Sequence, residues 1–178
     1  MDATAPNDVT PPPGVVFDLA ERAVDFVRRT LGVPLDYTPE TLPLLDHYVR
    51  SVPKERPELT DLVACAAGAY FGEVVRRQLG GRWDTSAAEP WGWRVVTTLG
   101  VTMSPVAFAE EVLLLGPAPE HDGSFEVPEQ ARPLVEEVLA SREVSDEEFY
   151  SFSGRIEALE AVADLLAGVA QVAAATPK

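Results

Sequence analysis

The chain has 178 residues, of which 46% are apolar, so it can bury the core of one domain and is not disordered over most of its length. Its 29 Asp and Glu residues outnumber its 14 Lys and Arg residues, and the formal net charge of −15 argues against binding to nucleic acid or to an anionic membrane. The single cysteine, Cys65, cannot form an internal disulfide and fits a reducing compartment, which predicts a cytoplasmic protein.

The chain begins with an acidic, proline-rich segment that lacks the basic and apolar regions of a secretory signal. Residues 1–13 are therefore expected to be a disordered lead-in, followed by a single domain over residues 14–175. Apolar residues at helical spacing behind the lead-in predict an amphipathic helix that ends near Gly32. A short helix is expected next, capped by either Thr38 or Thr41.

Residues 58–79 are predicted to form the longest helix of the first half. Arg76 and Arg77 lie in its last turn, and Gly80 can adopt the left-handed conformation that ends many helices. Small residues recur every four positions along this helix, which predicts a face that another backbone approaches closely. These residues are Ala64, Gly68 and Gly72.

Aromatic and β-branched residues over residues 81–103 predict a small antiparallel sheet of two or three short strands. One more short strand is predicted within residues 124–127. Trp91 and Trp93 are expected to point to the same side of one strand, because side chains two positions apart share a face.

Helical segments are predicted again after the sheet. One starts at Ser104, and a second covers residues 131–142. Ser145 and Glu148 match a capping box at the start of the last helical stretch, which Gly154 can break into two helices. The predicted fold is therefore α+β, with helices at both ends of the chain around a small sheet, and a mostly helical fold is the alternative.

The last predicted helix, residues 155–175, carries a broad apolar face and no charged residue after Asp164. Such a helix needs cover on more than one side, either from the domain core or from a second copy of the chain. A homodimer through this helix is the expectation. Its uncharged end, residues 165–175, is shorter than the roughly 18 apolar residues of a membrane span, so no membrane association is expected.

Seven residues form the candidate binding set, because large aromatic side chains dominate interfaces and arginine can contact an anion. The same residue types can instead close a small sheet over helices or form surface ion pairs. The seven residues are Tyr70, Glu73, Arg77, Trp83, Trp91, Trp93 and Arg94.

Catalytic and metal-binding patterns do not emerge from the sequence. His47 and His121 are isolated in sequence, so neither a metal nor a cofactor is expected. Cys65 lies in an apolar helical stretch, where burial would raise its pKa and make it unreactive. Adjacent acids such as Glu110 and Glu111 splay around a helix instead of converging on a substrate. No catalytic residue is predicted, and a non-enzymatic protein is favoured.

Acidity is concentrated in residues 110–148, which hold twelve acidic residues and two arginines. The segment can be a solvated face or a docking surface for a basic partner. The first functional hypothesis is a non-enzymatic interaction module, such as a regulator, adaptor or immunity-type inhibitor, that binds a protein partner. The alternative is a small-molecule-binding protein or an enzyme, with a pocket near Tyr70, Trp83, Trp93 and Arg94.

Four sequence motifs resemble a known pattern: LDYTPETL, GAYFGEVVRR, GGRW and FYSFSGRIEALEAVADLL. Together they resemble small uncharacterised bacterial proteins that share an LDYxxxSL-type opening and an aYxGEvxrxxxGgxW core. The likeness spans about residues 33–166, and Thr41 stands where the pattern has serine. It implies a single α+β domain from a bacterium and carries no known activity.

Overall fold

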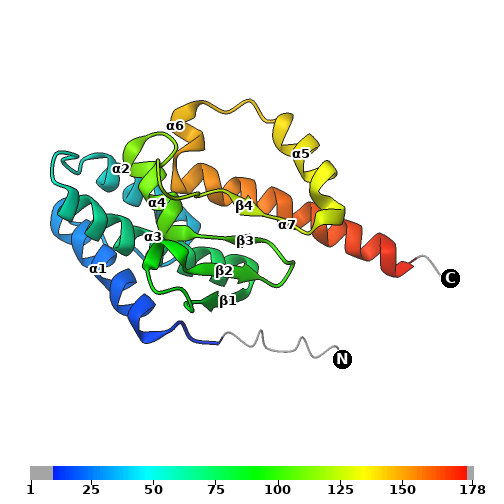
Figure 1. The fold of residues 1–178 in the computed structure, drawn as a ribbon, viewed down its shortest axis with the longest axis horizontal. Coiled ribbons are helices and arrows are strands. Elements are labelled where there is room, and N and C mark those ends of the chain that lie inside the picture. The colour runs from blue at the N-terminus through cyan, green and yellow to red at the C-terminus, as the bar shows by residue number, and fades with distance from the viewer. Residues whose placement is uncertain (1–9, 176–178) are drawn as a thin grey trace.

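Residues 10–175, the part of the chain that the computed structural model describes, contain seven α-helices and a four-stranded antiparallel sheet (Figure 1). The helices are α1 (Gly14–Leu31), α2 (Leu42–Arg50), α3 (Pro57–Leu79), α4 (Pro105–Leu114), α5 (Arg132–Ala140), α6 (Asp146–Phe149) and α7 (Phe152–Ala175). The strands are β1 (Gly81–Asp84), β2 (Arg94–Thr97), β3 (Thr102–Met103) and β4 (Phe125–Glu126). The predicted α+β class is confirmed. Most of the predicted lead-in, residues 1–9, lies outside the described residues.

Helix boundaries follow the predicted signals closely. α1 ends at Gly32, whose φ of 74° is the left-handed conformation that glycine adopts without steric cost. A turn of 3-10 helix over Pro39–Thr41 precedes α2, so Thr38 and Thr41 each stand before a helical segment, but neither side chain makes the predicted capping hydrogen bond. The Ser145 hydroxyl accepts a hydrogen bond from the N–H of Glu148, as the capping-box pattern predicts.

The central helix α3 packs between α1 and α4, and its predicted small-residue face makes the contact with α4. A Cβ atom at Gly68 would lie 2.5 Å from the Cα atom of Val106 in α4. A Cβ atom at Gly72 would collide with the ring of Trp83. These glycines therefore serve as a packing device, because any side chain would force α3 away from its neighbours.

One face of the sheet is buried against the helices. The antiparallel register places Trp83 opposite Val95, Val95 opposite Met103, and Met103 opposite Phe125, so one row of apolar side chains crosses all four strands. Phe125, on the edge strand β4, ends this row. The chain then arches from β4 through α5 and α6 before it enters α7 (Figure 1).

Two local expectations are wrong. Trp91 does not share a strand with Trp93, because Pro90–Gly92 forms a turn of 3-10 helix and β2 begins only at Arg94. Proline has no N–H to donate to a strand, which favours the helical turn. Gly154 does not break the last helix. The interruption lies between α6 and α7, at Tyr150 and Ser151.

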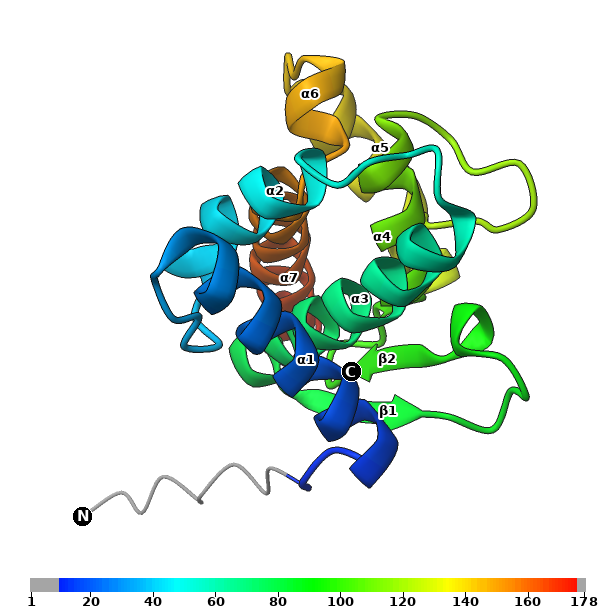
Figure 2. The same cartoon turned by 90° about the vertical axis from the view of Figure 1, so that its left-hand side faces the viewer.

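The last helix, α7, has two different halves. Its first half packs against α2, α3 and α5, and Figure 2 shows it entering the body of the molecule between α2 and α3. Residues 168–175 are exposed and extend beyond the body (Figure 1). By length and composition α7 could cross a membrane, since its most apolar window has a mean hydropathy of 1.5. One such helix is weak evidence for a membrane span, because core helices of soluble proteins and signal sequences meet the same criterion, and 22% of this window is buried in the fold.

Candidate functional site

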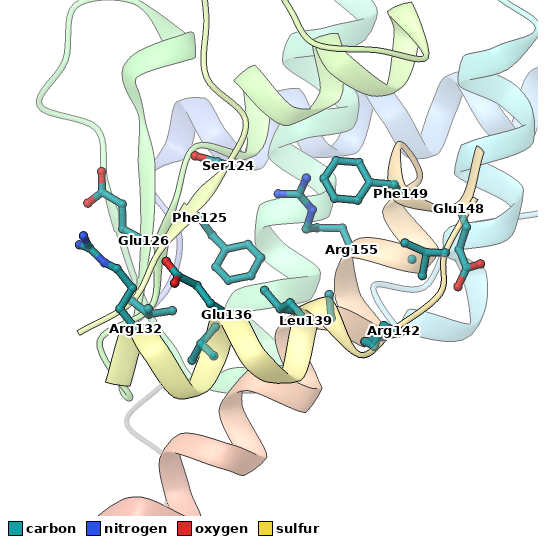
Figure 3. Close-up of a pocket in the computed structure, with 15 residues that line it drawn as sticks. Ser124, Phe125, Glu126, Arg132, Glu136, Leu139, Arg142, Glu148, Phe149 and Arg155 are labelled. Carbon is teal, nitrogen blue, oxygen red and sulfur yellow. The ribbon is translucent and has the colours of Figure 1, made fainter. Parts of the chain in front are cut away.

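A cavity of about 400 Å³ lies between α7 and an arm made of residues 125–149 (Figure 3). The arm comprises β4, α5, α6 and the loops that join them. Most of the cavity wall is apolar, and cavities of this size and character commonly bind small molecules. The apolar residues in the wall are Phe125, Val127, Val135, Leu139, Val144, Phe149 and Ala158.

Arg155 is the buried charged residue of this wall, with only 5% of its surface exposed. Its Nη1 donates a hydrogen bond to the carbonyl oxygen of Gly123 at 2.8 Å. The guanidinium carbon lies 3.7 Å from the centroid of the Phe108 ring and 5.7 and 5.5 Å from those of Phe125 and Phe149. Within residues 10–175 no carboxylate forms an ion pair with Arg155, and no acceptor pairs with its Nε or Nη2. The cavity wall thus contains a cation with unused hydrogen-bond donors.

The charge of Arg155 is only partly compensated. Burial lowers its pKa to about 10, and the negative charge of Glu111 opposes that shift. Gly123 lies between the two groups, because its N–H donates to Glu111 Oε1 at 3.1 Å while its carbonyl accepts from Arg155. An arginine with a pKa near 10 stays protonated at neutral pH. It therefore supplies a fixed positive charge and is not a proton-transfer group.

The start of α7 is fixed by a carboxylate from another helix. Asp46 of α2 accepts hydrogen bonds from the N–H of Phe152 at 2.7 Å, from the N–H of Ser153 at 3.1 Å, and from the Ser153 hydroxyl at 2.6 Å. The first N–H groups of a helix have no partner inside the helix, so Asp46 acts as a cap supplied from a distance. This cap fixes the position of Arg155, which lies in the first turn of α7.

Small residues in α7 leave room for the arm and for the cavity. Gly154 and Ala158 line the cavity with Arg155, and they lie on the same face because four residues make about one helical turn. A Cβ atom at Gly154 would collide with the carbonyl oxygen of Glu148 in α6. Glycine at this position therefore lets the arm close against α7.

An ion pair also holds the arm to the helical body. Arg50 of α2 donates to the carboxylate of Glu147 at 3.0 Å and to its carbonyl oxygen at 2.7 Å. The same junction lines a second hollow of about 580 Å³, which is more polar than the first and more open to solvent and includes Asp46 and His47. The second hollow lacks the apolar wall that distinguishes the first.

The rim of the apolar cavity is charged. Glu126, Glu136 and Glu148 line it together with Arg132 and Arg142 (Figure 3). All three glutamates are exposed, so water screens them far more than it screens the buried Arg155. Positive charge is therefore strongest at the back of the cavity, and the rim is mildly negative.

Three of the seven predicted site residues, Glu73, Arg77 and Trp83, come together in another place, around the buried carboxylate of Glu73. This carboxylate accepts hydrogen bonds from Arg76 Nε at 2.7 Å, from Arg76 Nη2 at 3.0 Å and from Trp83 Nε1 at 2.7 Å, and Arg77 Nε lies 3.4 Å away. Burial alone would raise the pKa of Glu73, but these hydrogen bonds outweigh it and hold the pKa below its usual value. The cluster joins α3 to β1. Glu73, Arg76 and Trp83 are buried in the packed interior, as is Tyr70, whereas the Arg77 side chain is exposed.

Tyr70 connects two of the sequence motifs. Its hydroxyl accepts a hydrogen bond from the N–H of Tyr37 at 2.8 Å and lies 3.0 Å from the Thr41 hydroxyl. The Tyr37 ring stacks on Tyr70 with centroids 4.7 Å apart, and the Arg77 guanidinium covers the Tyr37 ring at 4.1 Å. The LDYTPETL and GAYFGEVVRR motifs therefore pack against each other, which gives both a structural role.

The remaining predicted site residues lie apart from this cluster. Trp93 is buried and donates its indole N–H to the carbonyl oxygen of Ala87 at 3.1 Å. Arg94 pairs with Glu126 across the exposed face of the sheet at 3.5 Å. None of the seven predicted residues lines either of the two cavities.

Trp91 lies against His121, which is isolated in the sequence but has neighbours in the fold. The rings of Trp91 and His121 stack with centroids 5.2 Å apart, and His121 Nδ1 lies 2.7 Å from Glu110 Oε2. The buried indole N–H of Trp91 has no acceptor among the described residues. The described residues contain no group of three or more His, Cys, Asp and Glu that could hold a metal ion. Cys65 has a pKa raised to about 11, mainly by burial, as the sequence predicts.

The sequence reasoning missed Arg155, although a signal was present. Arg155 stands three positions after Phe152 and four before Leu159, both of which are fully buried. It therefore occupies a core position of the helical repeat, where an arginine is rarely found without a partner. The apolar face of this helix begins at Phe152, one turn before Ile156, and Arg155 lies on that face.

Comparisons of the chain with family models, with curated proteins and with solved structures find no match. The resemblance to small bacterial proteins therefore stays a prediction, and functional inference rests on the geometry of the cavity.

Proposed function

We propose that this protein binds a small molecule in the apolar cavity between α7 and the arm and does not transform it. The observation that carries the proposal is Arg155, a buried cation with unused donors in the wall of an otherwise apolar cavity. A buried charge without an ion-pair partner is costly, so a fold that retains one at a cavity usually uses it for a ligand. The sequence predicted a small-molecule pocket near Trp83 and Arg94 as the alternative function, whereas the proposed cavity lies between α7 and the arm.

The test uses two fluorescent probes of apolar sites, the neutral N-phenyl-1-naphthylamine and the anionic 1-anilinonaphthalene-8-sulfonate. Ala158→Trp fills the cavity from α7, whereas Ala170→Trp places the same side chain on the exposed part of the same helix. We expect the wild type and A170W to enhance the fluorescence of at least one probe, and A158W to lose at least about tenfold in affinity. Equal binding by A158W and A170W, or no enhancement by the wild type, would refute the proposal.

A second candidate function is the docking of a basic protein partner by the acidic segment. Ten of the twelve acidic residues in residues 110–148 are exposed, while Glu111 is buried and Glu110 is half-buried. An exposed surface of one sign steers an oppositely charged partner and gives binding that weakens with salt. Pull-down from a bacterial lysate across a salt series tests it, with E136Q/E137Q as the charge-reduced variant. No partner retained at low ionic strength, or the same partners retained by the variant at every salt concentration, counts against docking by this segment. The cytoplasmic location inferred from the sequence belongs to the same proposal.

A further inference from the structure

We infer that the ligand of the apolar cavity is a monocarboxylic acid with an apolar chain, bound with its carboxylate against Arg155. This inference rests on the proposed function and adds the chemical class of the ligand. Three features of the cavity support it, namely the donor geometry at its back, the charge of its rim and its volume.

The donor geometry at the back of the cavity selects a carboxylate. Nη1 of Arg155 is engaged by Gly123, which leaves Nε and Nη2 without an acceptor in the described part of the chain. These two groups lie on one edge of the planar guanidinium and match the two oxygens of a carboxylate, which they bind in parallel. Figure 3 shows Arg155 between Phe125 and Phe149, so the bound carboxylate would be flanked by aromatic side chains.

The rim allows only one negative charge on the ligand. A ligand with a second anionic group would place it in the apolar middle of the cavity or at the rim, where three glutamates outnumber Arg132 and Arg142. Both positions are unfavourable, because an unpaired charge is costly in an apolar environment and like charges repel. A dicarboxylate or a phosphate ester should therefore bind more weakly than a monocarboxylate of the same length.

The volume of the cavity sets the length of the chain. At about 30 Å³ for a water-sized group, 400 Å³ holds roughly thirteen such groups. A carboxylate on a saturated chain of about ten carbons has this size. The chain would lie along Val135, Leu139 and Val144, which the arm contributes to the wall.

The test compares three ligands with apolar chains of nearly equal length, decanoate, decanol and decyltrimethylammonium, by isothermal titration calorimetry on the full-length protein. We expect decanoate to bind at least about tenfold more tightly than decanol, because a hydrogen-bonded ion pair is added to the same apolar contacts. Decyltrimethylammonium should bind most weakly. Equal affinity for decanoate and decanol would overturn the inference and leave the proposed cavity function intact. Failure of all three ligands and of both fluorescent probes would overturn the inference and the proposed function together.

Two substitutions of Arg155 separate its charge from its bulk. Arg155→Lys keeps the positive charge but lacks the paired donor edge of the guanidinium, so it should retain only part of the preference for decanoate, whereas Arg155→Met should lose it while still binding decanol. Arg82→Met replaces an exposed arginine of β1 that does not line the cavity, so it is the matched control and should leave the preference unchanged. Circular dichroism checks that each variant is folded. If R155M does not fold, the ratio of decanoate to decanol affinity in the wild type still decides the inference. An R155M variant that folds and keeps the tenfold preference would also overturn it.

Discussion

Replacement of Gly68 by alanine tests the close contact between α3 and α4. The new Cβ atom would lie 2.5 Å from the Cα atom of Val106, 2.8 Å from its nitrogen and 2.9 Å from the carbonyl oxygen of Pro105. All three neighbours are backbone atoms, so no side chain can rotate away to make room. The whole of α4 would have to move outward by about 1 Å to restore ordinary van der Waals contact.

The expected loss of stability is the difference between two opposing effects. Overpacking against a backbone that cannot yield costs about 3 kcal/mol, at the upper end of the usual range. Alanine is about 1 kcal/mol more favourable than glycine inside a helix, which offsets part of this cost. Gly68→Ala should therefore lower the free energy of unfolding by about 2 kcal/mol and the Tm by about 4 to 8 °C.

Gly168 in α7 provides the matched control, because a Cβ atom there meets no other atom within 4 Å. Gly168→Ala should raise the free energy of unfolding by up to about 1 kcal/mol, since only the helix-propensity effect operates. The assay is urea denaturation followed by circular dichroism, with both variants and the wild type at the same concentration. The reasoning is refuted if G68A is as stable as the wild type or is stabilised in the way expected for G168A.

Four further predictions concern other features of the molecule. Glu73→Gln should destabilise the protein by about 3 kcal/mol at pH 7, because Arg76 is left buried without its carboxylate. The pKa of Glu73 is lowered in the fold, so wild-type stability should fall as the pH drops below about 4.5, and thermal melts across pH should show the difference between E73Q and the wild type shrinking there. Asp46→Ala should lower the free energy of unfolding by about 1 to 2 kcal/mol through loss of the α7 cap, and an unchanged urea midpoint would contradict this role. Cys65 should react slowly with iodoacetamide at pH 7 in the folded protein and rapidly in urea, because its pKa is about 11 in the fold, and equal rates would contradict its burial. The homodimer expected from the sequence should appear in light scattering and dissociate in Ala170→Glu, whereas a wild-type monomer at micromolar concentration would rule it out.

Features that depend only on residues close together in the chain could be predicted from the sequence. Helical spacing and terminal signals predicted α1, α3 and the capping box before α6, because the 3.6-residue repeat and the capping groups act within a few positions. The small-residue face of α3 could also be predicted, since small residues at every fourth position lie on one side of a helix and allow another backbone to approach closely. The raised pKa of Cys65 followed from an apolar helical stretch.

The contacts between polar side chains could not be predicted, because they join residues that lie far apart in the sequence. Asp46 caps a helix that starts more than a hundred residues later, and His121 meets Glu110 across a turn that the sequence leaves undefined. Trp83 is an interior residue because the register of β1 and β2 places it opposite the buried Val95, and Trp93, just before β2, is buried with its indole N–H on the Ala87 carbonyl. The cavity at Arg155 arises from the path of the arm over α7. That path depends on contacts between segments far apart in the chain, and no local pattern encodes them.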